Sequence, residues 1–83
     1  MTSKEIAEWM SAYLVRTLKI KTEQVDPQLP FDEYGLDSRR AAEMVADLSD
    51  WLNRELQLEL FYDHPSIDEL SAYLAQTTGE LDL

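Results

Sequence analysis

Apolar residues recur at every third or fourth position in three stretches of this sequence, which is the spacing of helices with one buried face. The first stretch, residues 2–18, carries Ile6, Trp9, Met10, Tyr13, Leu14 and Leu18. The second begins at Asp37 or Ser38 and carries Ala41, Val45, Leu48 and Leu52, with Met44 and Trp51 at its margin. The third, residues 66–75, carries Ile67, Leu70, Tyr73 and Leu74. The pattern predicts three helices that pack their apolar faces together.

Residues that favour helix ends flank these stretches. Thr2 with Glu5, and Ser66 with Glu69, have the spacing of a capping box, in which the two side chains bond to backbone N–H groups at a helix start. Asn53 is a suitable end for the second helix, because asparagine tolerates the left-handed backbone conformation that ends many helices. These signals support the boundaries given by the apolar spacing.

The segment between the first two predicted helices, residues 19–36, has the composition of a loop. It contains Pro27, Pro30 and Gly35, and it has no sustained apolar period. Three apolar residues should hold it against the core: Val25, Leu29 and Phe31. So long a loop is uncommon in a small domain and often has a function.

A shorter connector follows the second predicted helix. Its apolar residues are Leu56, Leu58, Leu60 and Phe61. They are too closely spaced for a long amphipathic helix, so we expect one short helical turn near residues 59–62, before a break at Pro65. The whole predicts an all-α fold, a small four-helix bundle with three longer helices and one short helix. We expect a single domain over residues 1–83, with a core of about 4–76 and a flexible tail at 77–83.

The composition narrows the classes of function. Apolar residues are 45% of the 83 residues, enough for a modest core. The formal net charge of −10 disfavours nucleic-acid binding and suits basic protein partners. The chain has no cysteine, and its carboxylates lack the spacing of a metal loop, so no metal site is predicted. No apolar run approaches the length of a membrane span and no signal-peptide pattern is present, so we expect no membrane contact and a cytoplasmic location.

The stretch FDEYGLDSRRAAEM, residues 31–44, places Ser38 at a helix start. Propensity alone makes this serine, or the aspartate before it, a helix cap. A self-contained hydrolase is poorly supported, because the Gly-x-Ser-x-Gly pattern is missing and the only histidine, His64, precedes a proline in a predicted tight turn. We therefore predict no catalytic residues, and the residues alone leave Ser38 as a cap or a modification site.

Two motifs resemble those of a known family when they are taken together. PFDEYGLDS contains Gly35-Leu36-Asp37-Ser38, and LELFYDHPSIDELSAYL contains Tyr62-Asp63-His64-Pro65-Ser66. Both resemble the signatures of the acyl carrier protein family, and more narrowly of carrier domains from modular, type I polyketide synthases. The resemblance covers roughly residues 4–76. Asp-Ser alone is a weak signal, whereas both motifs at the family's separation in a small acidic helical chain are a strong one.

The resemblance implies a non-catalytic carrier that tethers acyl intermediates as thioesters, in polyketide or related fatty-acid or hybrid biosynthesis. It implies that Ser38 carries 4′-phosphopantetheine from coenzyme A, that Asp37 flanks it as the cap or as a metal-side contact for the transferase, and that Gly35 turns the chain into the helix. The implied partners are a phosphopantetheinyl transferase and acyl-loading and condensing enzymes. The isolated domain is expected to be a monomer.

The family also implies a docking surface for partner enzymes along the second helix. The residues expected there are Leu36, Arg39, Arg40, Ala42, Glu43 and Asp50. Arg39 departs from the family pattern, which has an apolar residue directly after the serine, and this departure bears on the choice of partner. The two arginines could pair with a phosphodiester on Ser38, or they could be solvated and contact only partners.

Two other functions remain open from the sequence. A peptidyl carrier of nonribosomal peptide synthesis is the nearer alternative, although Leu36 and the FYDHPS segment disfavour it, since those carriers usually show Gly-Gly-His-Ser or Gly-Gly-Asp-Ser. An unmodified helical adaptor with the same fold is the other alternative.

Overall fold

The computed structural model describes the backbone of residues 2–81 and the side chains of residues 2–77. Over this range the elements are α1 (Ser3–Leu18), η1 (Thr22–Gln24), η2 (Phe31–Tyr34), α2 (Ser38–Leu52), α3 (Glu59–Asp63) and α4 (Ile67–Leu81). The described residues form no strand, and their one bridge joins Pro30 to Ser66. The predicted all-α bundle of three longer helices and one short helix is confirmed.

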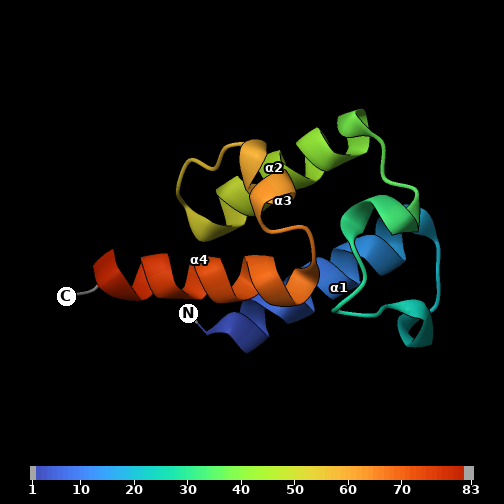
Figure 1. Cartoon of the computed structure of the whole chain (residues 1–83), viewed down its shortest axis with the longest axis horizontal. Helices are drawn as coiled ribbons and strands as arrows, with labels where there is room; N and C mark the ends of the chain where they lie inside the picture. The colour runs from blue at the N-terminus through green and yellow to red at the C-terminus, as the bar shows by residue number, and fades with distance from the viewer. Residues whose placement is uncertain (1, 82–83) are drawn as a thin grey trace.

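The helices surround a single apolar core. Figure 1 shows α4 lying along α1, with α2 above them and the short α3 between α2 and α4. Eight side chains are almost completely buried: Ile6, Met10, Leu14, Met44, Leu48, Ile67, Leu70 and Leu74. They come from α1, α2 and α4, so the three stretches with helical apolar spacing do supply the centre of the fold.

The predicted helix ends are confirmed where a local cap sets them. The Thr2 hydroxyl accepts a hydrogen bond from the Glu5 N–H at 3.2 Å, and the Thr2 N–H donates to the Glu5 carboxylate at 3.1 Å. The Ser66 hydroxyl accepts from the Glu69 N–H at 3.2 Å. Asn53 ends α2 in the left-handed conformation, with φ at 56°.

Two details of the helices differ from the prediction. Met44 was predicted at the margin of the apolar stripe but is completely buried, whereas Leu52 was predicted within the stripe but is only half-buried. The buried face of α2 is therefore centred closer to Met44 than the sequence indicated. The last helix was expected to end at residue 75, but α4 continues to Leu81. Within this added part, the Thr77 hydroxyl accepts a hydrogen bond from the Arg54 guanidinium at 2.8 Å and donates to the Leu74 carbonyl at 3.1 Å, which ties α4 to the segment after α2. Residues 82–83 of the predicted flexible tail lie outside the described residues.

The long connector between α1 and α2 is an ordered segment that contains η1 and η2. The Tyr34 hydroxyl donates to the Asp26 carbonyl at 2.6 Å and accepts from the Asp26 N–H at 2.8 Å, which closes the segment on itself. The Phe31 N–H donates to the Pro65 carbonyl at 2.7 Å, and the buried Phe31 ring stacks on Phe61 at 4.6 Å. The connector is thereby held against the segment that joins α3 to α4.

Within the described part of the chain, no helix is long and apolar enough to cross a membrane.

Candidate functional site

Asp37, and not Ser38, caps the N-terminus of α2. The Asp37 carboxylate accepts a hydrogen bond from the Arg40 N–H at 2.8 Å, and its backbone is extended, as a cap requires. Ser38 is the first residue inside the helix and is exposed. Its hydroxyl has no hydrogen-bond partner among the residues that the structure describes. This hydroxyl is therefore open to an approaching molecule at the start of α2.

Gly35 turns the chain from η2 into α2. Its φ of +82° lies in the left-handed region, where an L side chain is strained. An added Cβ would meet nothing within 4 Å, so the backbone conformation, and not a lack of space, favours glycine here. The turn supports the predicted role of Gly35 in directing the chain toward the helix that begins at Ser38.

A groove of about 390 Å³ opens beside Ser38, and we call it the serine groove. It is lined by Pro30, Phe31, Asp32, Glu33, Leu36, Asp37, Ser38, Ala41, Phe61, Tyr62 and Pro65. The stacked rings of Phe31 and Phe61 are buried beneath it, whereas Tyr62 is 67% exposed. The two motifs that are separate in the sequence thus line one surface feature.

The charged residues that line the groove are all acidic. Its lining includes Asp32, Glu33 and Asp37 but neither lysine nor arginine. Among the described residues, no group of His, Asp or Glu side chains could hold a metal ion. The arrangement offers the exposed Ser38 hydroxyl beside an apolar surface with an acidic rim.

His64 does not line this groove. It ends α3, where its N–H donates to the Leu60 carbonyl at 2.9 Å, and its ring stacks on Tyr73 with a centroid separation of 4.2 Å. The expected role of His64 as a turn residue fits this position. Ser38 and His64 therefore do not form the nucleophile and base of a triad.

The residues expected to contact partners lie around the exposed part of α2 and its entry. Arg39, Arg40, Ala42, Glu43 and Asp50 are exposed, and Leu36 is half-buried in the wall of the serine groove. The Arg39 guanidinium lies 3.5 Å from the Glu43 carboxylate. The Arg39 side chain is therefore directed along the helix toward Glu43.

Some contacts between α1 and α2 carried no signal in the sequence. The Tyr13 hydroxyl of α1 donates to the Asp47 carboxylate at 2.8 Å, and burial together with this carboxylate raises the pKa of Tyr13 above its usual value. The Trp9 ring stacks on Trp51 at 5.3 Å. These contacts join α1 to α2 across long sequence separations. Tyr62 was part of a recognised motif, but its exposure beside the groove could not be foreseen.

Comparisons with known proteins agree with this geometry. A family model described as a phosphopantetheine attachment site matches residues 8–74. Acyl carrier protein TtuC of Teredinibacter turnerae is 31% identical over 75 residues, which are 90% of this chain and 86% of that protein. A phenolphthiocerol/phthiocerol polyketide synthase of Mycobacterium tuberculosis is 35% identical over 71 residues, which are 86% of this chain but only 4% of that much longer protein.

Solved structures show the same fold. The HMG-ACPI domain from the CurA module of Lyngbya majuscula has a TM-score of 0.87 at 26% identity, over 99% of this chain and 83% of that one. A free-standing peptidyl carrier protein from Acinetobacter baumannii has a TM-score of 0.86 at 28% identity, over 93% and 96% of the two chains. The chain therefore belongs to the phosphopantetheine-attachment family, as a carrier protein homologous to acyl carrier proteins and to the carrier domains of polyketide synthases.

Proposed function

We propose that Ser38 is the residue that carries 4′-phosphopantetheine, and that the chain presents acyl groups to the enzymes of polyketide or related fatty-acid or hybrid biosynthesis. One observation supports the choice of residue above all others: Asp37 satisfies the helix terminus, so the exposed Ser38 hydroxyl has no structural role to lose. Both recognised motifs also border the groove beside that hydroxyl.

The surroundings of Ser38 suit a phosphodiester. Ser38 begins a helix of 15 residues, and the N-terminus of a helix attracts negative charge through its free N–H groups and its dipole. When bound, 4′-phosphopantetheine supplies a terminal thiol, which this cysteine-free chain lacks. The chain's own contribution is to hold the attachment point rigidly and in the open.

The chain acts, in this proposal, on behalf of other enzymes and performs no catalysis. Neither His64 nor Asp37 is placed to serve Ser38 as a base, because His64 packs on Tyr73 and the carboxylate of Asp37 is engaged with the helix terminus. A phosphopantetheinyl transferase would have to supply the base for modification, and acyl-loading and condensing enzymes would act on the modified protein. A cytoplasmic location and a monomeric state belong to the same proposal.

The test is modification in vitro, and the chain offers a matched control. Ser3 is also the exposed first residue of a helix, behind the cap residue Thr2. Wild type and Ser3→Ala should each gain one phosphopantetheine from coenzyme A and a broad-specificity phosphopantetheinyl transferase, as read by intact mass. Ser38→Ala should gain none while keeping its circular dichroism spectrum. Modification of Ser38→Ala at another residue would refute the assignment.

A peptidyl carrier is the second candidate, because the Acinetobacter baumannii structure is a peptidyl carrier protein. The fold does not separate the two classes, whereas the sequence relatives are acyl carrier proteins and polyketide synthases. Incubating the modified protein with polyketide acyltransferases and with adenylation domains of nonribosomal peptide synthesis compares them directly. We expect loading by the acyltransferases; aminoacyl loading alone would favour the second candidate. An unmodified helical adaptor is excluded by any phosphopantetheine gain at Ser38.

A further inference from the structure

Positive and negative side chains follow a fixed order along the exposed face of α2, although the net charge of the chain is strongly negative. Four exposed residues at spacings of four, three and four positions share one side of the helix, and we call them the α2 stripe: Arg39, Glu43, Ala46 and Asp50. The opposite side of α2 is buried and carries Ala41, Met44, Val45 and Leu48. The stripe therefore lies on the side of α2 that a partner can cover.

The two ends of the α2 stripe have opposite charge. Arg39 lies next to Ser38, and Glu43 follows one turn later. Asp50 lies about 16 Å from Arg39 along the helix axis. Asp47 belongs to the neighbouring side of the helix, where the Tyr13 hydroxyl engages it. The stripe thus runs from a cation beside the proposed attachment point to a carboxylate at the far end, in a chain whose net charge is −10.

The stability of α2 does not explain why an arginine occupies position 39. A cation in the first turn opposes the helix dipole, and the first turn of α2 contains no acidic residue. The ion pair with Glu43 is weak, because both side chains are largely exposed, at 88% and 57%, and the cation precedes the anion, which is the less favourable order on a helix. Removing Arg39 should therefore leave the fold as stable as before.

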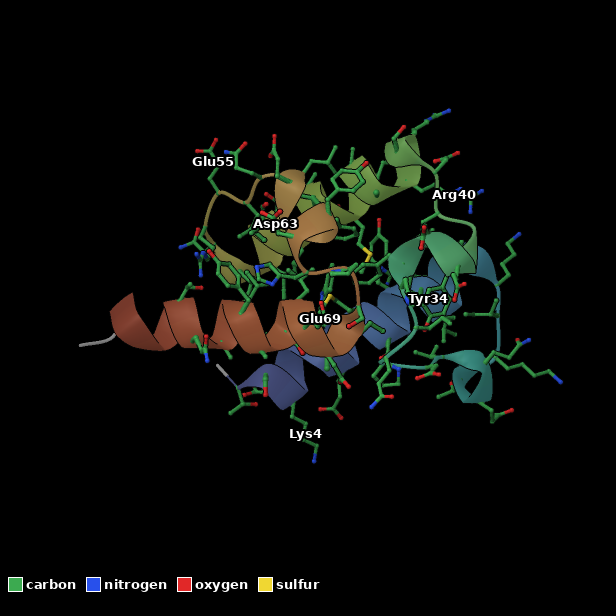
Figure 2. All side chains as sticks on the ribbon, in the orientation of Figure 1. Lys4, Tyr34, Arg40, Glu55, Asp63 and Glu69 are labelled. Carbon is green, nitrogen blue, oxygen red and sulfur yellow. The ribbon has the colours of Figure 1, made fainter. Side chains whose placement is uncertain are left out.

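Arg39 is also poorly placed to neutralise a group on Ser38. Side chains at adjacent helix positions do not face each other, and the guanidinium is directed toward Glu43 instead. Of the two roles expected for the arginines, contact with partners fits this geometry better than pairing with a phosphodiester. Arg40 lies on the same side of α2 as Asp47, which follows it by seven positions. Figure 2 shows the Arg40 side chain projecting at the start of α2.

We propose, on the basis of the function proposed above, that Arg39 and Asp50 select partner enzymes with the opposite charge order. An enzyme that acts on the arm carried by Ser38 docks beside the attachment point and therefore covers Arg39. Covering Arg39 takes its guanidinium out of water, and the largely exposed Glu43 carboxylate is only a weak partner for it. The fitting enzyme therefore has a carboxylate that faces Arg39 at the entrance of its active site and a cation that faces Asp50, about 16 Å away along the helix axis. An enzyme with a cation at its entrance would be rejected by Arg39.

The test exchanges the charges of Arg39 and Glu43, so that the α2 stripe begins with an acid beside Ser38 while Asp50 and the net charge are kept. In the double variant Arg39→Glu/Glu43→Arg, the ion pair is kept, the acid lies in the first turn and the pair has the favourable order, so folding should be unharmed. The control is Lys4→Glu/Glu8→Lys on α1, which reverses an exposed cation and acid at the same spacing. Figure 2 shows Lys4 on the side of the molecule opposite Arg40.

Each form is first modified to completion, as judged by intact mass, and then assayed for acyl transfer with a panel of polyketide acyltransferase and ketosynthase domains. For enzymes with an acidic entrance, the acyl-transfer rate should be about tenfold or more lower with the α2 double variant than with wild type. For enzymes with a basic entrance, the rate should not fall. Reversing the entrance charge of a slowed enzyme should restore its rate. The α1 control should match wild type throughout.

The outcomes separate this inference from the proposed function. If wild type is never modified, the proposed function fails and the inference fails with it. If all forms are modified but the α2 double variant and wild type have equal transfer rates across the panel, only the inference is overturned. It is also overturned if the α1 control slows the enzymes as much as the α2 double variant, or if the slowing is unrelated to the entrance charge.

Discussion

Replacing Asp37 by alanine should destabilise the protein, whereas replacing its neighbour Ser38 should not. The Asp37 carboxylate bonds to the Arg40 N–H at 2.8 Å, and loss of such a cap costs about 1 kcal/mol of unfolding free energy. The carboxylate also stabilises the helix dipole by about 0.3–1 kcal/mol. We therefore expect Asp37→Ala to lose about 1–2 kcal/mol, which lowers the melting temperature of a domain this small by roughly 5–15 °C.

Thermal and urea unfolding, followed by circular dichroism, measure this difference. Asp37→Asn is the control, because it keeps the accepting oxygen and loses only the charge, so it should lose about 0.3–1 kcal/mol. Ser38→Ala should stay within about 0.5 kcal/mol of wild type, since its hydroxyl has no partner among the described residues. If Ser38→Ala costs as much as Asp37→Ala, then Ser38 is the working cap, and the separation of cap from modification site is wrong.

Three further predictions concern the core, pH and docking. Met44→Ala should cost about 2–5 kcal/mol, as Leu48→Ala should, because both side chains are fully buried; an unchanged melting temperature would contradict this. Tyr13 ionises near pH 10.0 when unfolded and at higher pH when folded, owing to burial and Asp47, so stability should fall above about pH 10, and less steeply in Tyr13→Phe; equal alkaline slopes would contradict this. Glu43→Lys should slow modification by the transferase, most at low salt; equal rates there would argue against an electrostatic contact.

The ends of helices were predictable from the sequence wherever a few neighbouring residues determine them. Thr2, Asn53 and Ser66 end helices through bonds or conformations within a few positions, so the sequence contains the whole cause. The continuation of α4 to Leu81 was not predicted, and the contact there between Thr77 and Arg54 joins positions 23 apart, so it has no local signature. Met44 was misplaced for a related reason, since the packing of α2 against its neighbours decides which margin of the apolar stripe is buried.

The candidate site was predictable as two motifs but not as one surface. The Asp37–Ser38 pair and the FYDHPS segment each carried a family signature, yet only the fold brings Ser38 and Tyr62 to the same groove. The sequence also left open which of Asp37 and Ser38 is the cap, because both residue types cap helices well. The contact between Tyr13 and Asp47 spans 34 positions and has no local signature.

The central claim is that Ser38 carries the phosphopantetheine arm, and mass spectrometry of the protein purified from its native host tests it most directly. Intact mass reports how many groups are attached and whether an acyl group is loaded, and fragmentation locates the modified residue. We predict a single phosphopantetheine on Ser38, with part of the population bearing an acyl group. A folded protein that is wholly unmodified in the host, or modified at a residue other than Ser38, would contradict the claim.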